Sequence, residues 1–301
     1  MSISKYKVLM NVVKHGSLSK AAEVLGYTQS GVSHIINSLE EEFGFLLIIR
    51  GRSGIKLTKN GEQVLGTIRE VLKWNEHLEQ EVAAIHGIEI GTIHIGTFTS
   101  VSVHWLPGII KRFQQEFPRI EIHLVEGDYR QIEEWIIKGE IDCGFVTLPT
   151  RDKIDVIPLQ QDQMLILLPP EHPLSSRRVI QLSEIKDEPF IMPRKGSDDD
   201  INRVLTNAAI KPDIKFTAGD DYAIMAMVEM GLGISILPEL VLRGQQRNIH
   251  IKELDKPTFR SLGIAVNSMK NISPANKKFL AYVQNFCNQY PSPDRYKLPF
   301  T

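Results

Sequence analysis

The chain has 301 residues, of which 42% are hydrophobic and 24% charged, and its formal net charge is −1. This length predicts about two domains, and the composition is that of a globular protein rather than a disordered or fibrous one. Two cysteines, Cys143 and Cys287, are too few for a disulfide scaffold or a cysteine-rich metal site. No apolar run reaches the roughly 20 residues of a membrane span, and no secretory signal pattern is present, so we expect a cytoplasmic protein without a membrane partner.

Charge is unevenly distributed along the chain. Residues 1–60 carry eight basic and four acidic side chains, which gives 8 − 4 = +4 and leaves −1 − 4 = −5 for the remainder. A basic segment joined to an acidic body is a candidate polyanion-binding module, although local asymmetries of this size also arise by chance.

The first 60 residues have the pattern of a winged helix-turn-helix. Apolar spacing predicts a helix over 3–15, a second one that Ser17 or Ser19 caps and Gly26 ends, and a third from about 29 to 43. A hairpin with strands at 46–49 and 55–57 follows. Two helices joined by a tight turn, with a basic hairpin behind them, are typical of a DNA-binding module.

The third helix predicts an outward-facing polar surface. If its apolar residues (Val32, Ile35, Ile36 and Leu39) lie inside, the opposite face carries Gln29, Ser30, Ser33, His34 and Asn37. These compact groups suit base edges and phosphates in a major groove. Both features also have a non-functional explanation. Most polar helix faces are simply exposed to solvent, and Arg50 and Arg52 taken alone are common surface charges.

These residues together resemble the N-terminal signature of LysR-type transcriptional regulators. The matching positions are Ala21-Ala22, Leu25, Thr28-Gln29-Ser30, Val32-Ser33, Leu39-Glu40, Gly44, Arg50 and Leu57-Thr58 with Gly61. Gly31 departs from the usual Ala or Pro, and Leu47-Ile48-Ile49 from the usual Leu-Phe and a polar residue. The resemblance implies that the DNA-contacting residues are Thr28, Gln29, Ser30, Ser33 and His34, with Arg50 and Arg52 on the wing.

Residues 59–87 are predicted to form a linker and dimerisation helix. Val64, Val71, Leu78 and Ile85 recur every seven residues, and Ile68, Asn75 and Val82 recur in the second core position. The alternative is an amphipathic helix that packs on its own domain. The family resemblance favours the dimerisation helix, because these regulators dimerise through one.

Alternating strands and helices after residue 87 predict a parallel sheet flanked by helices. The segments 92–96, 141–144 and 231–238 resemble landmarks of the LysR effector domain, which is similar to type II periplasmic binding proteins. The predicted fold class is therefore α/β, with a winged helix-turn-helix (1–58), a linker helix (59–87) and a two-lobed effector-binding domain (88–301). We expect lobe I to comprise about 88–161 and 267–301, and lobe II about 162–266.

Ligands in open α/β sheets bind beyond the carboxyl ends of strands. The polar residues predicted at such ends, and therefore as effector-binding, are Thr97, Thr99, Ser100, Ser102, Thr147, Arg194 and Ser197. Their hydroxyl and cationic groups indicate a small, anionic effector. The ordinary alternative is that the hydroxyls cap helices and that Arg194 points to solvent.

The sequence therefore predicts a sequence-specific DNA-binding regulator that a small molecule modulates. No enzyme motif, metal-ligand spacing or cofactor fingerprint is present, so we expect no catalytic residues, metal or cofactor. The resemblance implies a dimer of dimers on promoter DNA, with RNA polymerase as a further partner. The alternative is a solute-binding or enzymatic α/β protein with an N-terminal docking module.

Overall fold

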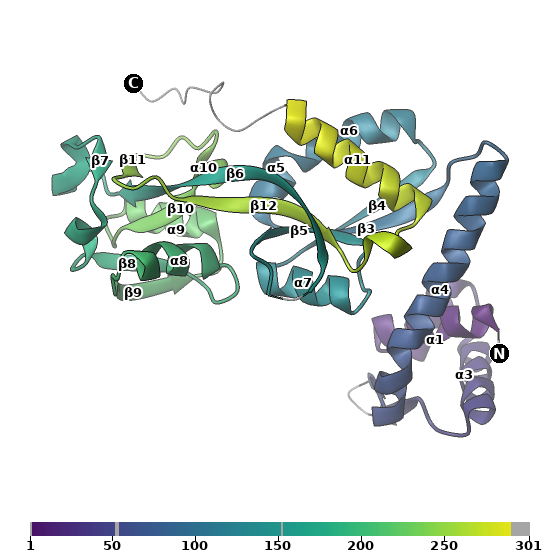
Figure 1. Cartoon of the computed structure of the whole chain (residues 1–301). Helices are drawn as coiled ribbons and strands as arrows, with labels where there is room; N and C mark the ends of the chain where they lie inside the picture. Colours follow the sequence, from purple (N-terminus) through teal and green to yellow (C-terminus); the bar gives the residue numbers. More distant parts are fainter. Residues whose placement is uncertain (1, 52–53, 152, 290–301) are drawn as a thin grey trace. The chain divides into compact units, whose positions relative to one another are not determined.

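The computed structural model describes residues 2–51, 54–151 and 153–289. The chain divides by its internal contacts into two compact units, Met1–Gly91 and Thr92–Thr301. Figure 1 shows the elements of each unit, which are described here separately. Within the described ranges, none of the helices is both long and apolar enough to cross a membrane.

The N-terminal unit contains four helices and a hairpin. These are α1 (Ile3–His15), α2 (Leu18–Leu25), α3 (Gln29–Phe43), β1 (Ile48–Gly51), β2 (Gly54–Leu57) and α4 (Lys59–Ile85). Ser17, Thr28 and Thr58 each cap the helix that follows by accepting a hydrogen bond from its first turn. The predicted helix-turn-helix with a two-stranded wing is confirmed, although β1 begins two residues later than expected.

One apolar core joins the helices of this unit. Val32, Ile36 and Leu39 of α3 are fully buried, while Ile35 of the same face is only partly buried. The start of α4 contributes Leu65 and Ile68 to this core, so the first part of the linker helix packs on its own unit. The alternative of an amphipathic helix therefore applies to this part of α4.

The C-terminal unit alternates strands and helices. Its elements are β3 (Gly91–Thr97), α5 (Thr99–His104), α6 (Leu106–Glu116), β4 (Ile120–Glu126), α7 (Tyr129–Ile137), β5 (Cys143–Leu148), β6 (Asp155–Leu168), β7 (Val179–Ile180), β8 (Pro189–Pro193), α8 (Asp199–Asn207), β9 (Asp213–Ala218), α9 (Asp221–Glu229), β10 (Ser235–Pro238), α10 (Glu239–Leu242), β11 (His250–Leu254), β12 (Phe259–Val266) and α11 (Pro274–Gln289).

The main sheet is mixed rather than parallel. Its strand order is β4-β3-β5-β12-β6-β11-β7, and β10 also pairs with β6. Strands β3 and β5 are parallel as expected, but β12 runs antiparallel to both β5 and β6. The alternation of helices and strands could not predict this, because β12 returns from the end of lobe II and enters the sheet from the opposite direction.

Each of the two lobes has its own apolar core. The long strands β6 and β12 pair side by side and run from one lobe to the other (Figure 1). Lobe I is built around β3, β5, α6, α7 and α11, and lobe II around β8, β10, α8 and α9. The strand residues Leu262, Ile264, Ala265 and Val266 belong to the core of lobe I, as the strand and helix pattern suggests, so the approximate boundary at 266 lies a few residues too late. The physical reason is that this part of β12 pairs with β5.

Candidate functional sites: the surface of α3 and the interlobe cleft

The outer face of α3 presents the polar residues that the sequence singled out. Thr28, Gln29, Ser30 and His34 are exposed, and Ser33 is partly exposed. Thr28 also caps the helix, since its Oγ1 accepts a hydrogen bond from the Gly31 N–H at 3.1 Å. These side chains can therefore meet a groove of DNA without any change in the packing of the unit.

Arg50 on the wing lies against this face of α3. Its Nη1 donates to Ser33 Oγ at 3.1 Å and its Nη2 donates to Asn37 Oδ1 at 2.8 Å. The guanidinium itself is exposed, so it can exchange these neutral partners for a phosphate at little cost. Arg52, the second predicted wing residue, lies outside the described residues.

A buried carboxylate that sequence reasoning missed fixes the wing. Glu40 of α3 is only 8% exposed, and its Oε1 accepts hydrogen bonds from the N–H groups of Leu47 and Ile48 at 2.6 and 3.1 Å. Glu40 thus attaches the start of β1 to α3. The only signal in the sequence was its place next to Leu39 in the quoted signature, which gives no indication of burial.

The second half of α4 exposes a row of large apolar side chains. Their exposed fractions range from 39% to 82%, and the residues are Val71, Trp74, Leu78, Val82 and Ile85. Their spacing places them on one face of the helix. We call this face the α4 stripe. Asn75, the predicted polar core residue, donates its side-chain N–H to Glu79 Oε1 of the same helix at 2.7 Å.

A cleft between the two lobes forms an enclosed cavity of about 90 Å³. It is small beside the roughly 300–1,000 Å³ of pockets that hold drug-sized ligands. Its lining comes from both lobes and consists of Phe98, Thr99, Ser100, Gly127, Asp128, Tyr129, Met164, Pro193, Arg194, Ser197, Asp200, Ile201, Gly219, Asp221, Leu237, Pro238 and Arg260.

Arg260 is the centre of a buried polar network at the base of the cleft. The residue is 1% exposed. Its guanidinium donates to Asp162 Oδ2 at 2.9 and 2.6 Å, to the Tyr129 hydroxyl at 2.8 Å and to Ser100 Oγ at 2.9 Å. Burial favours a lower pKa for Arg260, but the carboxylates of Asp162 and Asp200 raise it, so the guanidinium stays charged. Its donors are therefore committed within the fold.

Three carboxylates line the cavity: Asp128, and two at the start of α8 and α9. Asp200 in the first turn of α8 is 4% exposed, and Asp221 at the start of α9 is partly buried. Burial raises the pKa of both carboxyl groups, while the charge of Arg260 lowers it. Sequence reasoning missed these residues, because acidic residues at the start of a helix normally face solvent. Arg260, a lone charge within an apolar strand, gave the clearest signal.

The predicted effector-binding residues divide into two groups. Thr99, Ser100, Arg194 and Ser197 line the cavity. The other three lie outside its lining: Thr97 and Thr147 are buried within the fold, and Ser102 donates to Thr97 Oγ1 at 3.2 Å. Their part in effector binding stays a prediction.

Ion pairs link the lobes beside the cleft. Asp199 of α8 accepts hydrogen bonds from Arg130 at 3.1 Å and from Arg151 at 2.9 Å to each carboxylate oxygen. Arg203 of α8 donates to the Leu148 carbonyl at 2.9 Å. These contacts join the two lobes in the structure.

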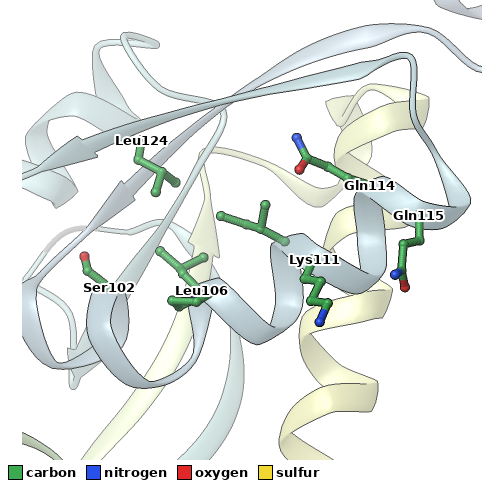
Figure 2. A pocket seen from close by; sticks show the side chains of 8 residues that line it. Ser102, Leu106, Lys111, Gln114, Gln115 and Leu124 are labelled. Carbon is green, nitrogen blue, oxygen red and sulfur yellow. The ribbon is translucent and has the colours of Figure 1, made fainter.

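A wider hollow lies on lobe I beside α6 (Figure 2). It measures about 500 Å³ and is lined by Ser102, Leu106, Pro107, Ile110, Lys111, Gln114, Gln115 and Leu124. Lys111 is its one charged lining residue. The buried charges that distinguish the cleft are thus not part of this surface.

Both units match known families. Residues 3–62 match the bacterial regulatory helix-turn-helix family described as lysR, and residues 86–288 match the LysR substrate binding domain. The family consists of transcriptional regulators rather than enzymes, which rules out the enzymatic alternative.

Relatives match over nearly the whole chain. The uncharacterized HTH-type transcriptional regulator YvbU of Bacillus subtilis (strain 168) is 37% identical over 283 residues, which is 93% of this chain and 97% of the relative. A full-length OxyR variant from Pseudomonas aeruginosa has a TM-score of 0.78 at 19% identity and covers 99% of both chains. Full-length CbnR in complex with its target DNA has a TM-score of 0.67 at 21% identity, covering 95% of this chain and all of that one. The chain therefore belongs to the LysR family of DNA-binding transcriptional regulators, with an N-terminal helix-turn-helix and a C-terminal effector-binding domain.

Proposed function

We propose that this regulator reads DNA with the exposed face of α3, and that a small effector in the interlobe cleft controls what the bound protein does at a promoter in the cytoplasm. The observation that carries the proposal is the contact of Arg50 with Ser33 and Asn37, because it supports a single surface shared by the wing and the recognition helix. Bases would be read by Gln29, Ser30 and His34 in the major groove.

Phosphate contacts would position this surface on the duplex. Arg50 gives up two neutral acceptors when it turns to a phosphate, and charge-assisted hydrogen bonds are stronger than neutral ones. The cap residue Thr28 lies at the N-terminus of α3, where backbone N–H groups favour an anion. The same role falls to Arg52 by the family resemblance.

The α4 stripe would join two copies of the chain. A row of five exposed apolar residues on one helix face is a strong candidate for a helix-to-helix interface. Two copies joined in this way present two recognition helices, which is the arrangement that reads a two-fold symmetric site. A dimer of dimers, and contact with RNA polymerase, extend this proposal by resemblance to the family.

The cleft supports effector control of the lobes. A ligand changes the balance between open and closed lobes only if it binds one state more tightly. Because the cavity is lined by both lobes and ion pairs link them, a ligand that fits the cleft would favour this arrangement of the lobes. The altered lobe arrangement would then change the geometry of the DNA complex.

Salt-dependent DNA binding tests the proposed surface. Loss of Arg50 in Arg50→Ala should weaken binding of the full chain to duplex DNA and reduce the slope of log K against log salt by about 1 per protomer. Lys270→Ala is the matched control, since it removes one exposed positive charge from the C-terminal unit. Equal slopes for Arg50→Ala, Lys270→Ala and the unmodified chain would contradict the assignment.

Sedimentation of the full chain tests the α4 stripe. Leu78 is 60% exposed in the middle of the stripe, so Leu78→Glu should reduce the number of chains in the assembly by placing two like charges in an apolar interface. Ile137→Glu places the same charge at a 42% exposed apolar position of α7 and should leave the association unchanged. A Leu78→Glu assembly with as many chains as the unmodified protein would place the interface elsewhere.

A further inference from the structure

The cleft contains a buried carboxylate that the fold does not satisfy. Asp200 lines the cavity and is 4% exposed, and among the described residues neither of its carboxylate oxygens accepts a hydrogen bond of normal geometry, although the Tyr129 hydroxyl is a neighbouring donor. Its ion-pair partner is Arg203, whose Nη2 lies 3.5 Å from Asp200 Oδ1, while Nη1 of the same guanidinium donates to the Leu148 carbonyl. A buried carboxylate without hydrogen bonds is costly, so its place in a ligand cavity indicates a partner that arrives from outside.

The helices that begin at the cleft carry their own negative charges. The first turn of α8 contains Asp199 and Asp200, α9 begins with Asp221, and Asp128 caps α7 by accepting from the Gln131 N–H at 2.9 Å. The partial positive charge at a helix N-terminus attracts anions, but here carboxylates of the protein already neutralise that charge. An anionic ligand without a cationic group would add a further negative charge beside Asp200 and Asp221.

The cations of the cleft are arranged unevenly. Arg260 is neutralised by Asp162, and its remaining donors reach Tyr129 and Ser100. Arg194 is exposed and its side chain lies along Gly219 at the cavity wall. It makes no side-chain hydrogen bond or ion pair to another described residue, so it is the lining cation that can meet an acid group of a ligand. The cleft therefore has an acidic interior and one available cation at its wall.

We propose that the effector is a small zwitterion of the α-amino-acid type, whose ammonium group binds between the carboxylates of Asp200 and Asp221 and whose acid group binds the Arg194 guanidinium. The inference rests on the proposed function of the cleft and names the chemistry of its ligand. It replaces the sequence-based expectation of an anionic effector with a zwitterion, which keeps the acid group but also carries a protonated amine. The ammonium would supply the hydrogen-bond donors that Asp200 lacks.

Thermal unfolding of the full chain with matched compounds tests this assignment. The probes are the twenty common α-amino acids, the N-acetyl derivative of each, and the 2-hydroxy acid that replaces its amine with a hydroxyl. We expect at least one free amino acid to raise the melting temperature by about 5 °C or more at a hundredfold excess over its Kd. Its N-acetyl and 2-hydroxy counterparts should bind about 30-fold more weakly or worse, because a carboxylate pair that loses its ammonium stays buried and unpaired.

Variants assign the binding to the named side chains. Asp200→Asn should weaken binding of the active amino acid about 30-fold or more, and Arg194→Gln should weaken it through the acid group. Asp213→Asn is the matched control, since it removes an exposed carboxylate of β9 outside the cavity and should leave the Kd unchanged. The proposal is overturned if no amino acid shifts the melting temperature, if the counterparts without a free amine bind equally well, or if Asp200→Asn retains the unmodified Kd.

DNA binding in the presence of the same compounds separates this proposal from the proposed function. If an amino acid binds but leaves the DNA complex unchanged, effector control fails while the ligand class stands. If only amine-free acids bind and alter the DNA complex, the ligand class fails while effector control stands.

Discussion

The recognition helix and the interlobe cleft both use polar side chains, but they hold them in opposite ways. On α3, neutral polar groups such as Gln29 and His34 are exposed, and their apolar neighbours on the same helix fix their direction. In the cleft, charged groups are buried, and residues far apart in the chain hold them: Asp162 and Arg260 are 98 positions apart. The exposed polar face of α3 therefore follows from the periodicity of one helix, whereas the cleft depends on the whole C-terminal unit.

The largest expected effect tests whether the cleft depends on its buried charges. Arg260→Met leaves Asp162 buried without its partner, and it should lower the free energy of unfolding of the C-terminal unit by about 3–5 kcal/mol. Urea unfolding of the full chain measures this change. Arg247→Met is the control: Arg247 pairs with Glu229, and both side chains are more than a fifth exposed, so this variant should lose far less stability than Arg260→Met. If both variants lose the same free energy of unfolding, the buried ion pair of Arg260 stabilises the unit no more than an exposed one, which contradicts the prediction.

A smaller effect tests whether the stability of the N-terminal unit depends on the close packing of α4 against the backbone before β1. A Cβ atom at Gly61 of α4 would lie 2.2 Å from the carbonyl oxygen of Leu47, a backbone atom that cannot move away alone. Gly61→Ala should therefore lower the free energy of unfolding of the N-terminal unit by about 1–3 kcal/mol and weaken DNA binding with it.

Gly66 of the same helix provides the control. A Cβ atom there meets nothing within 4 Å, so Gly66→Ala should raise the free energy of unfolding by up to about 1 kcal/mol. Circular dichroism of both variants during thermal unfolding gives the comparison. If Gly61→Ala is as stable as Gly66→Ala, the close approach of Gly61 to the Leu47 carbonyl does not contribute to the stability of the N-terminal unit.

The difference between the two regions also explains what could be predicted from the sequence. Helical spacing alone assigned both the buried Val32 and the exposed His34, because both follow from one periodicity. In contrast, Asp200 stands in a run of three aspartates that resembles a solvated helix start, and only the opposite lobe buries it. Ser100 was predicted as an effector contact; it lines the cavity, and its Oγ accepts a hydrogen bond from Arg260, 160 positions away. Such pairings depend on the order of strands in the sheet, which local patterns do not contain.

The central claim is that the fold leaves Asp200 buried without a normal hydrogen bond, ready for a ligand, at a cost to its own stability. Burial raises the pKa of Asp200, against the lowering effects of Arg260, Arg203 and Tyr129, and Asp199 raises it further. The folded state thus holds the proton more tightly than the unfolded state, so the carboxyl group costs stability increasingly as pH rises above about 4 and through its folded pKa.

Unfolding of the ligand-free full chain at a series of pH values tests this claim most directly. We expect Asp200→Asn to be more stable than the unmodified chain at neutral pH, by about 1 kcal/mol, and the difference to disappear as the pH approaches 4. Asp213→Asn should show no such gain. If Asp200→Asn is less stable than the unmodified chain at neutral pH, Asp200 serves the fold rather than a ligand, and the central claim is contradicted.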